Sequence, residues 1–182
     1  MTMYNPPARI VPPMVAPIGI WGFIDDGLRG VADPSSGAWE FADRAAYFAV
    51  AIPTTTVARR LWWANGATVN ASYNIDVGIY RDAGHKPGVK LVSAGSTAQG
   101  SASEVQFVNI TDVTLAAGLY WLAITCSSTS ATILRHASAV AAMPKGARFQ
   151  ENSALPLPAT ATPVQGTGVN VYLFGFATTA SP

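Results

Sequence analysis

The stretch that decides the fold runs from Tyr73 to Ile124 and reads YNIDVGIYRDAGHKPGVKLVSAGSTAQGSASEVQFVNITDVTLAAGLYWLAI. Its first residues alternate between apolar side chains and side chains that are mostly polar. Tyr73, Ile75, Val77 and Ile79 fall on one side of an extended strand, and Asn74, Asp76, Gly78 and Tyr80 fall on the other. This alternation predicts a strand with one dry face and one polar face.

Short strand-like runs separated by turn residues continue from there. Residues 81–89 contain Asp, Gly and Pro, which supply the φ values that a tight connection needs, and residues 90–93 and 103–110 predict two more strands. The run LYWLAITC, residues 119–126, is apolar on both faces, so we expect it to be buried on both sides. Further strands are predicted for residues 46–52, 56–63 and 169–177, and a long surface loop for residues 144–168. The pattern predicts an all-β fold, an antiparallel β-sandwich that is jelly-roll-like.

Two pieces of this sequence carry a resemblance to a known family. GIYRDAGHKPGVKLVSAG, followed by a polar loop and then VTLAAGLYWLAI, resembles a β-sandwich module of tailed-bacteriophage virion proteins and prophage-encoded hypothetical proteins. The resemblance covers Trp39 to Ile133, and its diagnostic pieces are Val77 to Tyr80, Lys86 to Gly88 and Leu115 to Leu122. Such modules occur in head decoration or cement proteins, head fibres and tail fibres, so the resemblance implies a virion protein without choosing among these roles.

Composition narrows the class of partner. Charged residues make up 12% of the 182 residues and hydrophobic residues 49%, which is a low charge content for a free monomer. The net charge of +1 provides no basic field for nucleic acid, and no apolar run is long enough to span a bilayer. The N-terminus lacks the pattern of a secretory signal, and the lone Cys126 excludes a disulfide within the monomer. We therefore expect a small buried cysteine, no partner among nucleic acids or membranes, and a cytosolic origin. With the virion role that the resemblance implies, the expected place of assembly is the host cytoplasm.

An extended arm is predicted before the sandwich. Prolines at positions 6, 7, 12, 13 and 17 prevent helix and weaken strand pairing, yet the residues between them are apolar. An apolar arm cannot bury itself, so it packs along its own domain or lies on a neighbouring subunit. We divide the chain into an arm and docking segment, residues 1–35, in which residues 18–24 are a candidate first strand, and a sandwich domain, residues 36–182. The candidate subunit or capsid contacts are Ile10, Val11, Met14, Val15, Ile18, Trp21, Phe23, Leu155 and Leu157.

Two adjacent tryptophans suggest an alternative function. The side chains of Trp62 and Trp63 should point to opposite faces of one strand, which would leave one in the core and the other exposed. An exposed indole beside Asn65 could pack on the apolar face of a pyranose. The alternative is therefore a module of a head or tail fibre that binds a glycan or a receptor on the host surface.

An enzyme is disfavoured. His85 and His136 stand in no spaced ligand motif, and Asp25 and Asp26 precede Gly27 in a predicted turn, where adjacent carboxylates usually serve the turn itself. We expect no catalytic residue, no metal and no cofactor. Together with the resemblance to phage virion modules, this predicts a structural protein of a phage particle, most simply a capsid decoration or cement protein that forms a homo-oligomer, with a trimer favoured, and contacts the major capsid protein.

Overall fold

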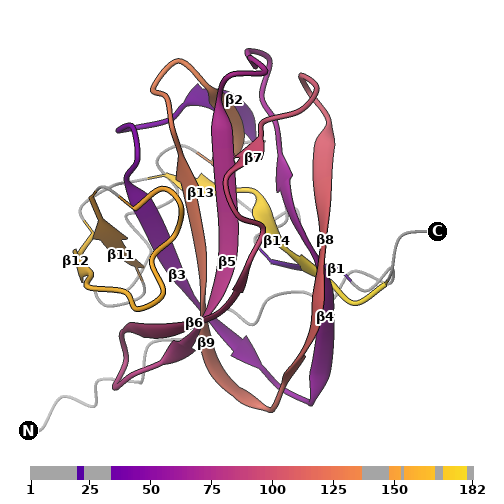
Figure 1. Cartoon of the computed structure of the whole chain (residues 1–182), viewed down its shortest axis with the longest axis vertical. Helices are drawn as coiled ribbons and strands as arrows, with labels where there is room; N and C mark the ends of the chain where they lie inside the picture. The colour runs from indigo at the N-terminus through magenta and orange to yellow at the C-terminus, as the bar shows by residue number, and fades with distance from the viewer. Residues whose placement is uncertain (1–19, 23–33, 137–147, 153, 167–169, 180–182) are drawn as a thin grey trace, which may run out of the picture.

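A computed structural model describes residues 20–22, 34–136, 148–152, 154–166 and 170–179. These residues form an all-β structure in which every strand pairing is antiparallel, and the sheets pack face to face as a sandwich (Figure 1). The predicted fold class, an antiparallel β-sandwich, is therefore confirmed.

One layer of the sandwich is a seven-stranded sheet. Its strands, in spatial order, are β12 (Val164–Gln165), β11 (Arg148–Glu151), β3 (Ala45–Ile52), β9 (Gly118–Cys126), β5 (Asn74–Asp82) and β6 (Pro87–Ser93), with β7 (Thr97–Ala98) pairing to β5 beside β6. At the centre of this sheet, β9 pairs with β3 on one side and with β5 on the other over long runs of residues, for example Ala46 with Ile124 and Ile79 with Leu122.

The facing layer consists of two smaller sheets. One contains, in spatial order, β1 (Ile20–Gly22), β14 (Phe174–Ala177), β4 (Thr56–Ala64) and β8 (Val105–Leu115), and the other contains β13 (Val171–Tyr172), β10 (Thr132–His136) and β2 (Ser35–Ala38). The last predicted strand, residues 169–177, is therefore split. The amide of Leu173 donates to Leu134 of β10 and its carbonyl accepts from Ala64 of β4, so this residue joins the two sheets.

The main core lies between the layers and is rich in aromatic rings. Phe48 of β3 makes edge contacts with Phe174 and Tyr172 from the opposite layer, at ring-centroid distances of 5.7 and 6.5 Å. Trp63 of β4 is fully buried in the same cluster. Rings of this size supply much of the apolar area that stabilises a sandwich, because each buries a large surface.

Burial on the two faces of β9 and β5 can be compared with the sequence predictions for these strands. β9 is buried on both sides from Trp121 onward, as its apolar run predicted. β5 is also buried on both sides, so its predicted polar face is wrong: Asp76 and Tyr80, on that face, are fully buried. The physical reason is a second cluster on the outer face of the sheet, where Ala154 and Leu157 cover Tyr80 and Trp121.

The tight connection predicted for residues 81–89 is present between β5 and β6. Gly84 and His85 both take positive φ values, 67° and 64°, and the amide of Ala83 donates to the carbonyl of Lys86. Two successive residues with positive φ match the right-handed twist of a hairpin, and glycine takes the first of them at no steric cost. The Asp82 side chain accepts the His85 amide and so fixes the turn.

Candidate functional site

The residues of the predicted glycan contact are all inside the protein. Trp62 is 3% exposed, Trp63 is not exposed at all, and Asn65 is fully buried. The two indoles do point to opposite faces of β4, but residues outside that strand cover both faces: Trp63 faces the main core, and Trp62 packs with Leu173 in an outer cluster. The assignment of Trp62, Trp63 and Asn65 to a glycan contact is therefore wrong.

Asn65 instead organises one end of the sandwich. Its side-chain oxygen accepts a hydrogen bond from Trp63 Nε1 at 2.9 Å, and its side-chain nitrogen donates to the carbonyls of Gln99 and Ser101 at 2.7 and 2.8 Å. A buried amide with these partners holds the loop after β7 against the end of β4, since leaving any of these groups unpaired would cost free energy.

Most of the predicted contacts in the arm lie outside the described residues, namely Ile10, Val11, Met14, Val15, Ile18 and Phe23. Trp21 belongs to β1, whose backbone pairs with β14 so that Trp21 lies opposite Phe176. The predicted first strand is thus present over residues 20–22. Within the described residues β1 is the end strand of its sheet, so the chain enters the sandwich at an edge.

Leu157 is not available for a neighbouring subunit. Its side chain is 2% exposed and packs in the outer cluster with Tyr80 and Trp121, whereas Leu155 is half-buried. The interface assignment of Leu157 is therefore wrong, because the protein's own sheet covers it. The surface loop predicted for residues 144–168 is wrong where the chain forms β11 and β12, but residues 154–162 between them belong to no named strand. These residues, here named the strap, cross the outer face of the sheet.

The strap is held by backbone hydrogen bonds that hardly depend on its side chains. The Leu157 amide donates to Asp76 Oδ2 at 2.9 Å, and the Leu157 carbonyl accepts from Lys90 Nζ at 2.6 Å. The Tyr80 hydroxyl donates to the Pro158 carbonyl at 2.7 Å. Further along, Lys90 donates its amide to Ala159, and Ala161 donates to Gly88, which makes a short ladder with β6.

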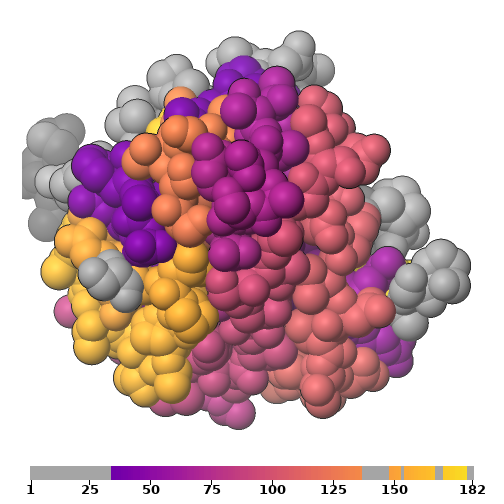
Figure 2. All heavy atoms as spheres, turned by 45° about the horizontal axis from the view of Figure 1, so that its top comes forward, coloured from indigo at the N-terminus to yellow at the C-terminus, as the bar shows by residue number. Residues whose placement is uncertain are grey.

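The space-filling view agrees with this packing. Figure 2 shows the late residues, in orange-yellow and yellow, lying directly against magenta atoms, the colour of β5 and β6. Large apolar side chains that stay exposed among the described residues are few and separate in sequence: Phe41, Val89, Val105 and Val164. Single exposed apolar residues of this kind are normal on a protein surface.

Burial perturbs several ionisable groups in this outer layer. Burial raises the pKa of Asp76, and the same cause raises the pKa of the Tyr47 and Tyr80 hydroxyls above their ordinary range. The Tyr47 hydroxyl donates to Glu151 Oε2 at 2.8 Å, and Glu151 also accepts the amide and the hydroxyl of Thr162. Neutral tyrosines and one carboxylate thus fasten the far end of the strap.

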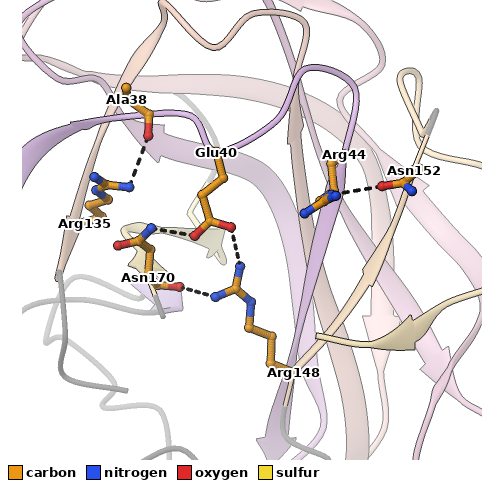
Figure 3. A network of polar contacts seen from close by, with 7 residues as sticks. All are labelled: Ala38, Glu40, Arg44, Arg135, Arg148, Asn152 and Asn170. Carbon is orange, nitrogen blue, oxygen red and sulfur yellow. Dashed lines mark hydrogen bonds and ion pairs between the residues drawn. The ribbon is translucent and has the colours of Figure 1, made fainter. Parts of the chain in front are cut away.

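A second polar network fastens β11 to the loop after β2 (Figure 3). The Arg148 guanidinium lies 3.4 Å from Glu40 Oε2 and donates to the carbonyl of Asn170 at 3.1 Å, while the Asn170 side chain donates to the other oxygen of Glu40. Nearby, Arg135 donates to the carbonyl of Ala38. Glu40 is thus bridged from two sides, an arrangement that suits a structural clamp.

Within the described ranges no three His, Cys, Asp or Glu side chains gather so as to hold a metal ion. Cys126 is buried, and burial raises its pKa to about 11, so the nucleophilic thiolate is scarce near neutral pH. The part of the chain that the structure describes has no helix long and apolar enough to cross a membrane.

Comparisons with known proteins returned no match, either to models of protein families or to curated proteins.

Proposed function

We propose that this chain is a non-enzymatic structural protein of a bacteriophage particle, a capsid decoration or cement protein that acts as a homo-oligomer. The observation that carries the proposal is the arm. Residues 1–17 hold five prolines among apolar side chains, and the chain leads from them into β1, an edge strand of the described sandwich. An apolar segment attached at an edge is well placed to lie on another subunit or on the capsid.

The proposed mechanism is burial of apolar area. At about 25 cal/mol per Å², an arm that lays several Ile, Val and Met side chains on a neighbour contributes several kcal/mol of association before the entropy of ordering is subtracted. In a closed ring each subunit gives one arm and receives one, so the contribution is repeated at every interface. A trimer on the capsid surface, held by its arms and touching the major capsid protein, is the simplest form.

The low charge content supports the same proposal. Only 12% of the residues are charged, and the large apolar side chains exposed among the described residues are those of Phe41, Val89, Val105 and Val164. The arm adds further apolar side chains, among them those of Ile10, Val11, Met14 and Val15. We do not propose that the protein binds a glycan, because the residues that suggested this function, Trp62, Trp63 and Asn65, are all buried.

The experiment compares the full chain with a chain that lacks residues 1–17, which keeps β1 intact. Light scattering during gel filtration should give an oligomer for the full chain and a monomer for the truncated one, and only the full chain should bind capsids. As a matched control, a full-length variant with Ile10, Val11, Met14 and Val15 changed to Ser keeps the length of the arm and removes its apolar character. A truncated chain that still forms the same oligomer and still decorates capsids contradicts the proposal.

A further inference from the structure

The chain contains a single Asn-Gly dipeptide, Asn65-Gly66, directly after β4. Asn-Gly is prone to deamidation, because a residue without a side chain lets its amide nitrogen reach the side-chain carbonyl carbon of the preceding asparagine. Base removes the Gly66 amide proton, the nitrogen attacks Asn65 Cγ, the bond from Cγ to Nδ2 breaks, and ammonia leaves. The product is a cyclic imide. Water then opens the imide at either carbonyl and gives aspartate or isoaspartate.

The fold holds the groups that this reaction must move. The Asn65 side-chain nitrogen, which would leave as ammonia, donates to the carbonyls of Gln99 and Ser101 at 2.7 and 2.8 Å. The Gly66 nitrogen, which would attack, donates its proton to the carbonyl of Thr132 at 2.9 Å. Asn65 is fully buried. A hydrogen-bonded amide in such a place meets base and water only when this part of the structure opens.

Close packing at Gly66 leaves no room for a residue that would react more slowly. A Cβ at this position would clash with Ser36 Oγ and would lie 2.8 Å from Thr132 Cβ. These side chains are themselves held in place, because Ser36 Oγ accepts the Ala67 amide and Thr132 Oγ1 accepts the Thr68 amide. The asparagine before Gly66 is needed for its buried hydrogen bonds. The structure therefore keeps a reactive pair of residues at a place where it excludes the reaction.

Neither product suits the folded structure. An ionised aspartate at position 65 can only accept hydrogen bonds, so it would set a buried charge against the carbonyls of Gln99 and Ser101, which are also acceptors and would lose their donor. Isoaspartate lengthens the backbone by one carbon. That extra atom would displace the backbone bonds on either side, from the Asn65 amide to Glu104 and from the Gly66 amide to Thr132.

We propose that Asn65-Gly66 is a deamidation site that the fold keeps closed, and that reaction at this site makes unfolding irreversible. The native chain keeps Asn65 intact. An unfolded chain loses the side-chain amide with time, and the reacted chain does not regain the sandwich. This site is independent of the role proposed for the whole protein.

Ageing the full chain in native buffer and in urea, at the same mildly alkaline pH, tests the protection. Peptide mapping by mass spectrometry should show deamidation of Asn65 at least about a hundredfold slower in native buffer, because only the open population reacts. As a matched control, Ala83→Asn places a second asparagine before Gly84 in an exposed turn, and this pair should react in both buffers. Similar rates for Asn65 in both buffers overturn the protection.

Refolding after partial ageing in urea tests the irreversibility. Once urea is removed and folded chains are separated by gel filtration, the folded fraction should carry unreacted Asn65, and the reacted chains should be excluded from it. Reacted chains that return to the folded fraction in proportion to their amount overturn this part of the inference.

Two variants test the same point without ageing, and they carry the test if refolding from urea is inefficient. Asn65→Asp reproduces one product and should fail to fold. Asn70→Asp is the matched control, since Asn70 is exposed and its side-chain oxygen accepts from Ser72, which an aspartate can also do. It should fold normally. An Asn65→Asp variant with the melting temperature of the wild type overturns the inference.

Discussion

Leu157→Ala tests whether the strap is part of the folded core. The side chain is 2% exposed, and the substitution removes three carbons from the outer cluster. At about 0.8 kcal/mol per buried carbon, the transfer cost alone is about 2.4 kcal/mol. The cavity left against Tyr80 and Trp121 adds to this, and measured Leu→Ala costs in cores range from about 2 to 5 kcal/mol. We expect a loss of about 2–4 kcal/mol in the free energy of unfolding.

Gly78 provides an independent check on the same contact. A Cβ on Gly78 would lie 2.9 Å from Leu157 Cδ1, which is closer than real Cβ contacts come, and it would lie tightly against the carbonyl of Val92 at 3.0 Å and Ser93 Cβ at 3.1 Å. Gly78→Ala alone should therefore cost about 1–3 kcal/mol. In the Leu157→Ala background the shortest of the three close contacts is gone, so the double variant should lose at least about 0.5 kcal/mol less than the sum of the single ones.

The measurement is urea denaturation followed by tryptophan fluorescence, with Leu155→Ala as the matched control, since Leu155 is only half-buried in the same segment. Surface substitutions usually change stability by no more than about 0.5 kcal/mol. A Leu157→Ala cost that small, or no larger than that of Leu155→Ala, would place Leu157 on the surface and refute the packing described above. Strict additivity with Gly78→Ala would refute the contact between the two residues.

Three further predictions concern the core and the polar network. Trp63→Ala should cost about 3–5 kcal/mol in the free energy of unfolding, because Trp63 is fully buried; a cost below about 1 kcal/mol in a denaturant titration would contradict its place in the core. Arg148→Ala breaks an ion pair whose side chains are 5% and 18% exposed and should cost about 3 kcal/mol or more, whereas Arg59→Ala breaks a pair that is 43% and 59% exposed and should cost about 1 kcal/mol or less. Equal losses of melting temperature for the two arginine variants would show that burial of the pair does not matter. Cys126, with a pKa of about 11, should resist a thiol reagent at about pH 8 until the protein is unfolded; rapid labelling of the native protein would place the thiol at the surface.

The sequence predicted the sandwich because short strand-like runs, alternating at residues 73–80 and apolar on both faces at residues 119–126, are separated by turn residues. The runs that become β5 and β9, the turn at Gly84 and the burial of β9 on both faces could all be derived from local pattern. These features depend on neighbours in the chain, whose side chains and dihedral preferences are visible in the sequence.

The sequence did not reveal what covers each face. From the sequence, Asp76 and Tyr80 were predicted to lie on a polar face of β5, and Leu157, which stands between two prolines, was predicted to contact a neighbouring subunit. Both predictions considered only the residues next to each position in the chain. The structure pairs Asp76 with Leu157 across 81 residues of sequence. Trp62 is buried by another contact between distant parts of the chain, with Leu173. One signal of this packing was present in the sequence: Asp76 stands between the apolar residues Ile75 and Val77. An acid that becomes buried in such a strand needs a partner that the strand itself cannot provide.

The measurement that tests the proposed function most directly is the amount and position of this protein on purified phage particles. Quantitative mass spectrometry should find it in a fixed ratio to the major capsid protein, and labelled antibodies should place it on the head. Absence from the particles, or a few copies confined to the tail, would contradict a capsid decoration or cement protein.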